Sequence, residues 1–141
     1  MMRLNGLLER ATSLIKNLST NTSKSSQVIE MCEPRMYLIL REDLAYKYIQ
    51  GEHALALFAL EHFDKFMEWN NQYIINLSVF NGLELQKLDS ELSDKFGVLI
   101  PVHSKFYEPD LQSPLPTAIC IFENGTGFVS RALKGLQLAT K

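Results

Sequence analysis

Short apolar runs alternate with longer helix-forming segments over residues 36–141, and this alternation limits the fold more than any other feature of the sequence. Apolar runs at 36–40, 73–79, 98–102 and 117–122 have the length and composition of strands. Helical patterns occupy 50–70, 82–96 and the residues after 129. Strands joined through a helix tend to be parallel, and strands joined by a loop antiparallel. The pattern therefore predicts an α/β three-layer sandwich with a four-stranded mixed sheet and helices on both faces.

The first 18 residues form a separate segment. Apolar side chains recur every three or four positions from Leu4 to Leu18, which predicts an amphipathic helix. Residues 19–35 are predicted to be a flexible linker, because 19–27 are polar throughout, and residues 36–141 form the folded domain. Burial of the apolar stripe contributes roughly 1.5–3 kcal/mol for each leucine or isoleucine. We therefore expect the helix to pack on its own domain, on a second copy in a homo-oligomer, or on another protein partner.

Composition and charge exclude several classes of protein. The chain of 141 residues is 46% hydrophobic and 21% charged, unlike a disordered protein. Its formal net charge of −2 provides no overall positive field, so any contact with tRNA must be local. Cys32 and Cys120 show neither zinc-ligand spacing nor a disulfide framework, and no apolar run reaches the roughly 20 residues of a membrane span. We expect a cytoplasmic protein without metal, cofactor or membrane contact.

Familiar catalytic motifs are absent from the sequence. It contains no G-x-S-x-G, no H-E-x-x-H, no phosphate-binding glycine loop and no C-x-x-C pair. The histidines show no metal-ligand spacing, and a histidine on a helix is more often a packing residue than a ligand. His53 stands out because it lies with Gln50 at the start of the predicted central helix, where free backbone N–H groups favour anions.

A second polar cluster precedes the last predicted strand. Lys105, Glu108 and Asp110 lie in a predicted loop at 103–116, and Thr117 begins the strand. A carboxylate and a hydroxyl held at the end of a sheet can orient and activate a water molecule, which is the minimum that ester hydrolysis requires. The same residues also suit an ordinary turn, since proline and aspartate are common there. Both interpretations stay open at this point.

The start of the domain resembles that of the type 2 peptidyl-tRNA hydrolases. The strand at 36–41 ends in a basic residue and is followed by Asp43-Leu44, and after a short loop Gln50-x-x-His53-Ala54 opens a long apolar helix. The order of the later elements also agrees over residues 36–141. The resemblance implies cleavage of the ester between a peptide or amino acid and tRNA, with tRNA as the partner.

The resemblance also implies roles for particular residues. Lys47 would contact the RNA or the ester, Asp110 or Glu108 would position the attacking water, and Thr117 would support it. Substrate-binding roles fall to four residues, namely Gln50, His53, Lys105 and Glu108.

The sequence departs from the family at two places. At the position that corresponds to the family's loop lysine this sequence has Tyr46, and Lys47 follows one residue later. At the position that corresponds to the family's aspartate after the third strand it has His103 or Ser104. The competing hypothesis is a catalytically inactive domain of the same fold that binds a protein partner through residues 1–18, because a fold does not fix a function.

Overall fold

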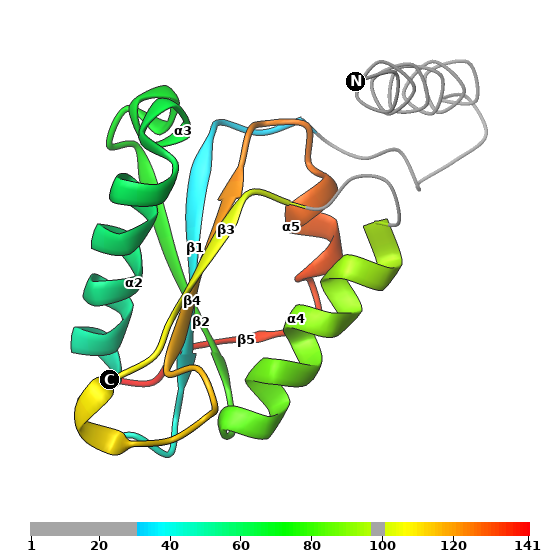
Figure 1. The fold of residues 1–141 in the computed structure, drawn as a ribbon. Helices are drawn as coiled ribbons and strands as arrows, with labels where there is room; N and C mark the ends of the chain where they lie inside the picture. The colour runs from blue at the N-terminus through cyan, green and yellow to red at the C-terminus, as the bar shows by residue number, and fades with distance from the viewer. Residues whose placement is uncertain (1–30, 97–100) are drawn as a thin grey trace.

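The computed structural model describes residues 31–96 and 101–141, in which five strands form one sheet and four α-helices surround it (Figure 1). The elements in chain order are β1 (Arg35–Arg41), α2 (Lys47–Glu61), α3 (Phe63–Trp69), β2 (Tyr73–Val79), α4 (Gly82–Phe96), β3 (His103–Phe106), the 3-10 helix η2 (Pro109–Leu111), β4 (Ala118–Glu123), α5 (Phe128–Ala132) and β5 (Gln137–Leu138). The predicted N-terminal helix at 1–18 lies outside the described residues, as do most of the predicted linker and residues 97–100.

The sheet is mixed, with strand order β3-β4-β1-β2-β5. β1 pairs with β2 in parallel, and the connection between them runs through α2 and α3, as expected for a crossover. The other neighbouring strands pair antiparallel. The prediction of a mixed α/β sheet is therefore confirmed, but the prediction of four strands is wrong.

The fifth strand comes from the segment predicted to be the closing helix. That helix is short and ends at Ala132, and after Gly135 the chain pairs with β2 through Gln137 and Leu138. The apolar spacing there resembles a helical stripe, yet Leu138 is 70% exposed. The conformation of these residues is thus determined by their pairing with β2 and not by the local spacing of apolar residues.

The third strand is also displaced along the sequence. Residues 101 and 102 precede β3, which begins at His103 inside the segment predicted to be a loop, while 98–100 lie outside the described residues. Pro101 has no backbone N–H to donate to a neighbouring strand. A strand that starts after Pro101 therefore lacks none of its hydrogen bonds on account of this proline. β3 is an edge strand of the sheet.

The predicted central helix is two helices. α2 begins at Lys47 and ends at Glu61. Its C-cap residue His62 leaves the helical conformation at φ −136° and donates its N–H to the Phe58 carbonyl. The His62 ring nitrogen Nε2 lies 3.1 Å from the carbonyl oxygen of His103 in β3. α2 also buries only one side, because Leu60 is 84% exposed. One face of α2 is therefore exposed, although its sequence is rich in apolar residues.

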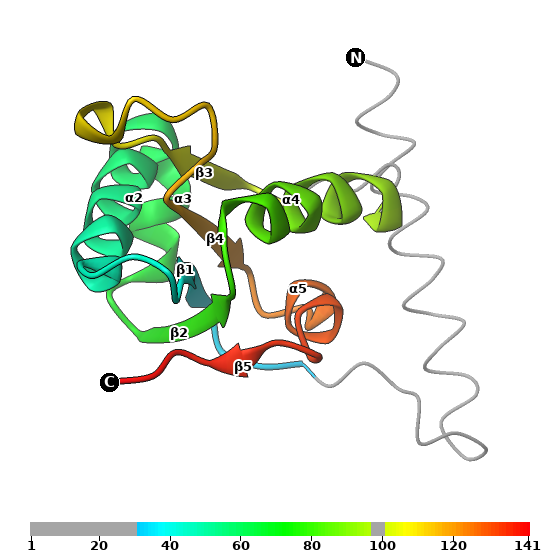
Figure 2. The same cartoon turned by 90° about the horizontal axis from the view of Figure 1, so that it is seen from below.

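Side chains of β1 alternate between two hydrophobic cores. Tyr37 and Ile39 pack with residues of α4 and α5, whereas Met36, Leu38 and Leu40 pack with residues of α2 and α3. Figure 2 shows α2 and α3 on one side of the sheet and α4 and α5 on the other. β1 is buried on both faces, as its uninterrupted apolar sequence predicts.

Candidate functional site

Polar side chains gather where the parallel strands β1 and β2 end, next to the start of α2. Backbone pairing continues past β1, because the Glu42 N–H donates to the Val79 carbonyl and the Asp43 N–H to the Phe80 carbonyl, at 2.9 and 3.2 Å. α2 then starts at this end of the sheet (Figure 1). Open α/β sheets bind ligands outside the carboxyl ends of their strands. We call the polar side chains gathered here the carboxyl-end site.

Gln50 bridges two other predicted site residues. The Thr117 hydroxyl donates to Gln50 Oε1 at 2.7 Å, and Gln50 Nε2 donates to Glu108 Oε2 at 3.1 Å. Thr117 is 1% exposed and Gln50 8% exposed, so the hydrogen bond between them is shielded from water, whereas the Glu108 end of the bridge is only part-buried. These two partners determine which way the carboxamide faces. The Glu108 carboxylate is thereby held by a buried residue of α2.

Asp110 lies beside this bridge without joining it through its side chain. Glu108 caps η2, and its Oε1 accepts the Asp110 backbone N–H at 3.4 Å. The Asp110 side chain is exposed, whereas Glu108 is half-buried. The sequence predicted that either Asp110 or Glu108 positions the attacking water. In the structure, Glu108 is the one that is linked to Thr117, through Gln50.

Lys47 belongs to a second polar group, on the first turn of α2. Its Nζ donates to Glu42 Oε2 at 2.6 Å and to Thr140 Oγ1 at 2.7 Å, and the lysine side chain is 11% exposed. Thr140 in turn donates its hydroxyl and its backbone N–H to Glu42, at 2.6 and 3.0 Å. Hydrogen bonds from Lys47 first, and then from Thr140, lower the pKa of Glu42 to about 2. The ammonium group of Lys47 is therefore held in an ion pair at neutral pH.

The two polar groups are neighbours on one helix. Lys47 and Gln50 lie three residues apart in α2, and side chains at that spacing share a face, with Cβ atoms roughly 5–6 Å apart. Both side chains are buried. The structure thus gathers Lys47, Gln50, Glu108 and Thr117 at one end of the sheet.

His53 lies one turn further along α2, at the margin of this site. Its ring is exposed and stacks on the Phe106 ring, with centroids 4.8 Å apart and an angle of 16° between the planes. Phe106 itself packs against the core beneath α2. His53 can offer an imidazole to a ligand at the surface, but it is not hydrogen-bonded to Gln50 or Glu108.

Lys105 lies on the opposite face of the sheet. Neighbouring residues of a strand point to opposite faces, so Phe106 faces α2 and Lys105 faces α4. Lys105 Nζ donates to Asp89 Oδ2 at 3.1 Å, and this hydrogen bond raises the pKa of Lys105. His103 Nε2 lies 3.0 Å from the other oxygen of Asp89. The structure therefore separates Lys105 from the other predicted site residues.

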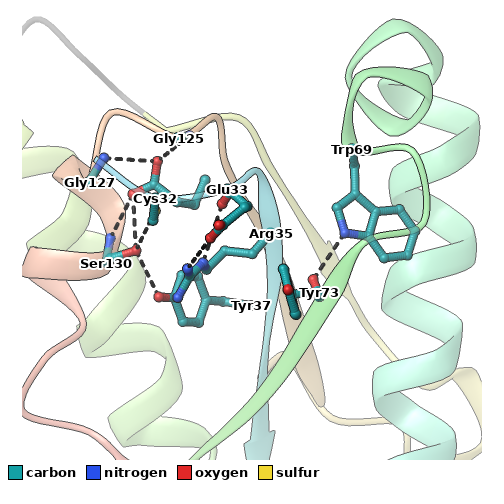
Figure 3. A network of polar contacts seen from close by, with 10 residues as sticks. Cys32, Glu33, Arg35, Tyr37, Trp69, Tyr73, Gly125, Gly127 and Ser130 are labelled. Carbon is teal, nitrogen blue, oxygen red and sulfur yellow. Dashed lines mark hydrogen bonds and ion pairs between the residues drawn. The ribbon is translucent and has the colours of Figure 1, made fainter. Parts of the chain in front are cut away.

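A further polar network lies at the other end of β1 (Figure 3). The Glu123 side chain, which is 0% exposed, accepts the N–H groups of Gly125, Gly127 and Ser130 at 2.8, 3.2 and 3.0 Å, and the Ser130 hydroxyl at 3.1 Å. The Tyr37 hydroxyl donates to Ser130 Oγ at 2.8 Å. Gly125 and Gly127 have φ of 104° and 86°, which other residues rarely adopt. This carboxylate fixes the turn between β4 and α5, so we assign it a structural role.

Sequence reasoning missed Glu42 and Thr140. Glu42 gave a partial signal, because it is an acidic residue directly after a buried strand. Thr140 gave none, since it reaches Glu42 from 98 residues away in the sequence.

The described parts of the chain contain no candidate metal cluster and no candidate membrane-spanning helix. Within them no group of three or more histidine, cysteine, aspartate or glutamate side chains could hold a metal ion. Across 31–96 and 101–141, none of the helices combines the length and apolar character that crossing a bilayer requires.

Comparisons with known proteins support the fold but give no function. No protein-family model and no curated protein matches the sequence. A solved structure of a protein of unknown function from Agrobacterium tumefaciens is similar, with a TM-score of 0.55 and 13% sequence identity, over 78% of this chain and 100% of that chain. At this level of identity the similarity concerns the fold alone.

Proposed function

We propose that the domain is an ester hydrolase of the peptidyl-tRNA hydrolase type, which cleaves the bond between a peptide or amino acid and tRNA at the carboxyl-end site. The observation that carries the proposal is the Gln50 bridge, which ties the Thr117 hydroxyl to the Glu108 carboxylate at distances of 2.7 and 3.1 Å. The arrangement of helices about the mixed sheet is also consistent with the sandwich that the resemblance implies. A cytoplasmic location is part of the proposal, because the bulk of tRNA is found there.

Glu108 acts as the general base in the proposed mechanism. A water molecule hydrogen-bonded to Glu108 attacks the ester carbonyl carbon, and its proton passes to the carboxylate. The tetrahedral intermediate then collapses, the carbon–oxygen bond to the ribose breaks, and the leaving oxygen takes the proton back from Glu108. Gln50 and Thr117 are positioning residues, because they act through Glu108. Lys47 lies on the same helix face and contacts the ester or the RNA near it.

Release of the peptide from purified peptidyl-tRNA tests the proposal, with and without Mg²⁺. Glu108→Gln keeps a hydrogen-bonding side chain but removes the base, so we expect kcat to fall by about 10²-fold or more. Glu52→Gln, on the exposed side of α2, is the matched control and should leave the rate unchanged. Absence of release by the unaltered protein would refute the proposal. A larger loss in Asp110→Asn than in Glu108→Gln would transfer the role of base to Asp110.

A catalytically inactive binding domain is the second candidate, and the ion pairs at the site favour it. RNA binding relies on lysine and arginine side chains that neutralise phosphates. Arg41 is paired with Asp43 at 2.9 Å and Lys47 with Glu42 at 2.6 Å. In this alternative the predicted helix at 1–18 engages a protein partner. Deletion of residues 1–27 should then change the elution volume on size exclusion, whereas an unchanged volume and stability would argue against it.

A further inference from the structure

Residues 137–140, which we call the tail segment, lie against the carboxyl-end site. β5 pairs antiparallel with β2 over two residues, and the next N–H, that of Ala139, donates to the Asn76 carbonyl at 2.9 Å. The chain then passes to the α2 side of the sheet, where Ala139 packs against the core beneath α2 and Thr140 meets Glu42. In Figure 1 the end of the chain lies beside the start of α2.

Thr140 is held as a ligand would be held. Its backbone N–H and its hydroxyl donate to the two carboxylate oxygens of Glu42, at 3.0 and 2.6 Å. Its hydroxyl also accepts from Lys47 Nζ at 2.7 Å, and its carbonyl accepts from the Tyr48 hydroxyl. Every polar atom of this residue therefore has a side-chain partner on β1's extension or on α2. The lysine and the glutamate are largely buried, at 11% and 23% exposure.

Apolar packing contributes little to holding the tail segment in place. Leu138 is 70% exposed, and only two residues of β5 pair with β2. The contacts that hold the segment are a short strand pairing, the packing of the small side chain of Ala139, and the hydrogen bonds to Thr140. Any extended peptide can supply the same backbone groups, and a serine or threonine can supply the hydroxyl.

We infer that Glu42, Lys47 and Tyr48, together with the edge of β2, form a binding site for an extended peptide with a hydroxyl side chain, and that the tail segment occupies this site within its own chain. The inference rests on the proposed function in one respect, because it assigns the site to the peptide part of the ester substrate. Lys47 and Gln50 are neighbours on the first turn of α2, so this peptide site adjoins the proposed hydrolytic group. The tail segment then competes with the substrate.

The test uses the full chain with its tail released. Thr140→Pro removes both the N–H and the hydroxyl that bind Glu42, whereas Thr140→Ser keeps both and is the matched control. The probe is the peptide acetyl-Gln-Leu-Ala-Thr-Lys-amide, titrated into each protein and followed by the amide NMR signals of Glu42 and Asn76. A tethered segment acts at an effective concentration in the millimolar range, so the parent and the serine variant should bind the probe at least about tenfold more weakly than the proline variant.

Three results would overturn the inference. The first is that the probe shows no saturable binding to Thr140→Pro, and the second is that the probe binds the parent as tightly as it binds Thr140→Pro. The third concerns a probe with valine in place of threonine, which we expect to bind Thr140→Pro about tenfold more weakly than the original probe; equal binding of the two probes would contradict the inference. A chain ending at Leu138 is the second variant, and should bind the probe as the proline variant does. If both variants unfold, the tail segment is part of the folded core and the inference fails. The probe contains no ester, so failure of peptide binding is distinguishable from failure of the proposed hydrolysis.

Discussion

Replacing Glu42 by glutamine tests the electrostatics of the carboxyl-end site. The pKa of Glu42 falls from an ordinary value of 4.5 to about 2 because Lys47 and Thr140 donate to its carboxylate. This difference corresponds to an upper limit of about 3 kcal/mol of stabilisation at about 1.36 kcal/mol per pH unit. The side chain is 23% exposed, so solvent screening should reduce the measured contribution to about 1–2 kcal/mol.

The pH dependence follows from the direction of the shift. A carboxyl group whose pKa is lowered by folding stabilises the folded state fully above its unfolded pKa, and loses that contribution as the pH falls. For Glu42 the loss takes place between about pH 4.5 and about pH 2. Urea unfolding should therefore show Glu42→Gln to be less stable than the parent by about 1–2 kcal/mol at pH 7 and almost equal to it near pH 2.5.

Two controls make this prediction specific. Glu52→Gln, at an exposed position of α2, should change stability by less than about 0.5 kcal/mol at either pH. In a double-mutant cycle, Thr140→Val should be coupled to Glu42→Gln, because the two residues share two hydrogen bonds. A difference between Glu42→Gln and the parent that stays constant with pH would refute the reasoning.

Three further substitutions test the packing described above, each by urea unfolding with a fluorescence or circular dichroism readout. Thr117→Val should cost about 1–3 kcal/mol, because it leaves a buried carboxamide oxygen without its donor, whereas Thr126→Val, on a half-buried turn, should cost less. Glu123→Gln should cost about 2–4 kcal/mol, since an amide cannot accept at both ends from four donors; an unchanged midpoint would contradict the structural role. Gly51→Ala should cost about 1–3 kcal/mol, because its Cβ would lie 2.7 Å from a leucine methyl of β1, while Gly135→Ala, with nothing within 4 Å, should be neutral.

Elements with a uniform local pattern were predictable from the sequence. The strand expected at 73–79 is β2 (Tyr73–Val79), and the helix expected at 82–96 is α4 (Gly82–Phe96). Leu77 and Val79 alternate with polar residues in β2, and Leu85, Leu88 and Leu92 recur every three or four residues in α4. The local pattern was sufficient to predict these two elements, because the tertiary contacts of the fold favour the same conformation there.

Elements that depend on distant partners were not predictable. β5 is only two residues long, and its strand conformation comes from pairing with β2, about 60 residues earlier in the chain. The break at His62 likewise coincides with a contact to His103 in another strand. Neither interaction leaves a periodic trace in the sequence.

The candidate site was predictable as a set of residues but not as a geometry. The resemblance singled out Gln50, Glu108 and Thr117, and the hydrogen bonds that join them span 58 and 67 residues of sequence. The hydrogen bond from Lys47 to Thr140 could not be foreseen, because the two residues lie 93 positions apart in the sequence. The position of Lys105 depended on where β3 begins, which fixes the face to which each of its side chains points.

The brevity of β5 has a consequence for motion within the folded domain. β1 and β4 are each hydrogen-bonded to neighbouring strands along both edges, so the amides of Ile39 in β1 and Ile119 in β4 should exchange with solvent only when the whole domain unfolds. Ala139 and Thr140 are fixed by a few hydrogen bonds near an exposed edge, and should exchange through a far less costly local opening. A small fraction of intact molecules therefore has the tail segment detached at any moment. The frequency of this opening, rather than any rearrangement of the sheet, sets how often Glu42 can meet another chain.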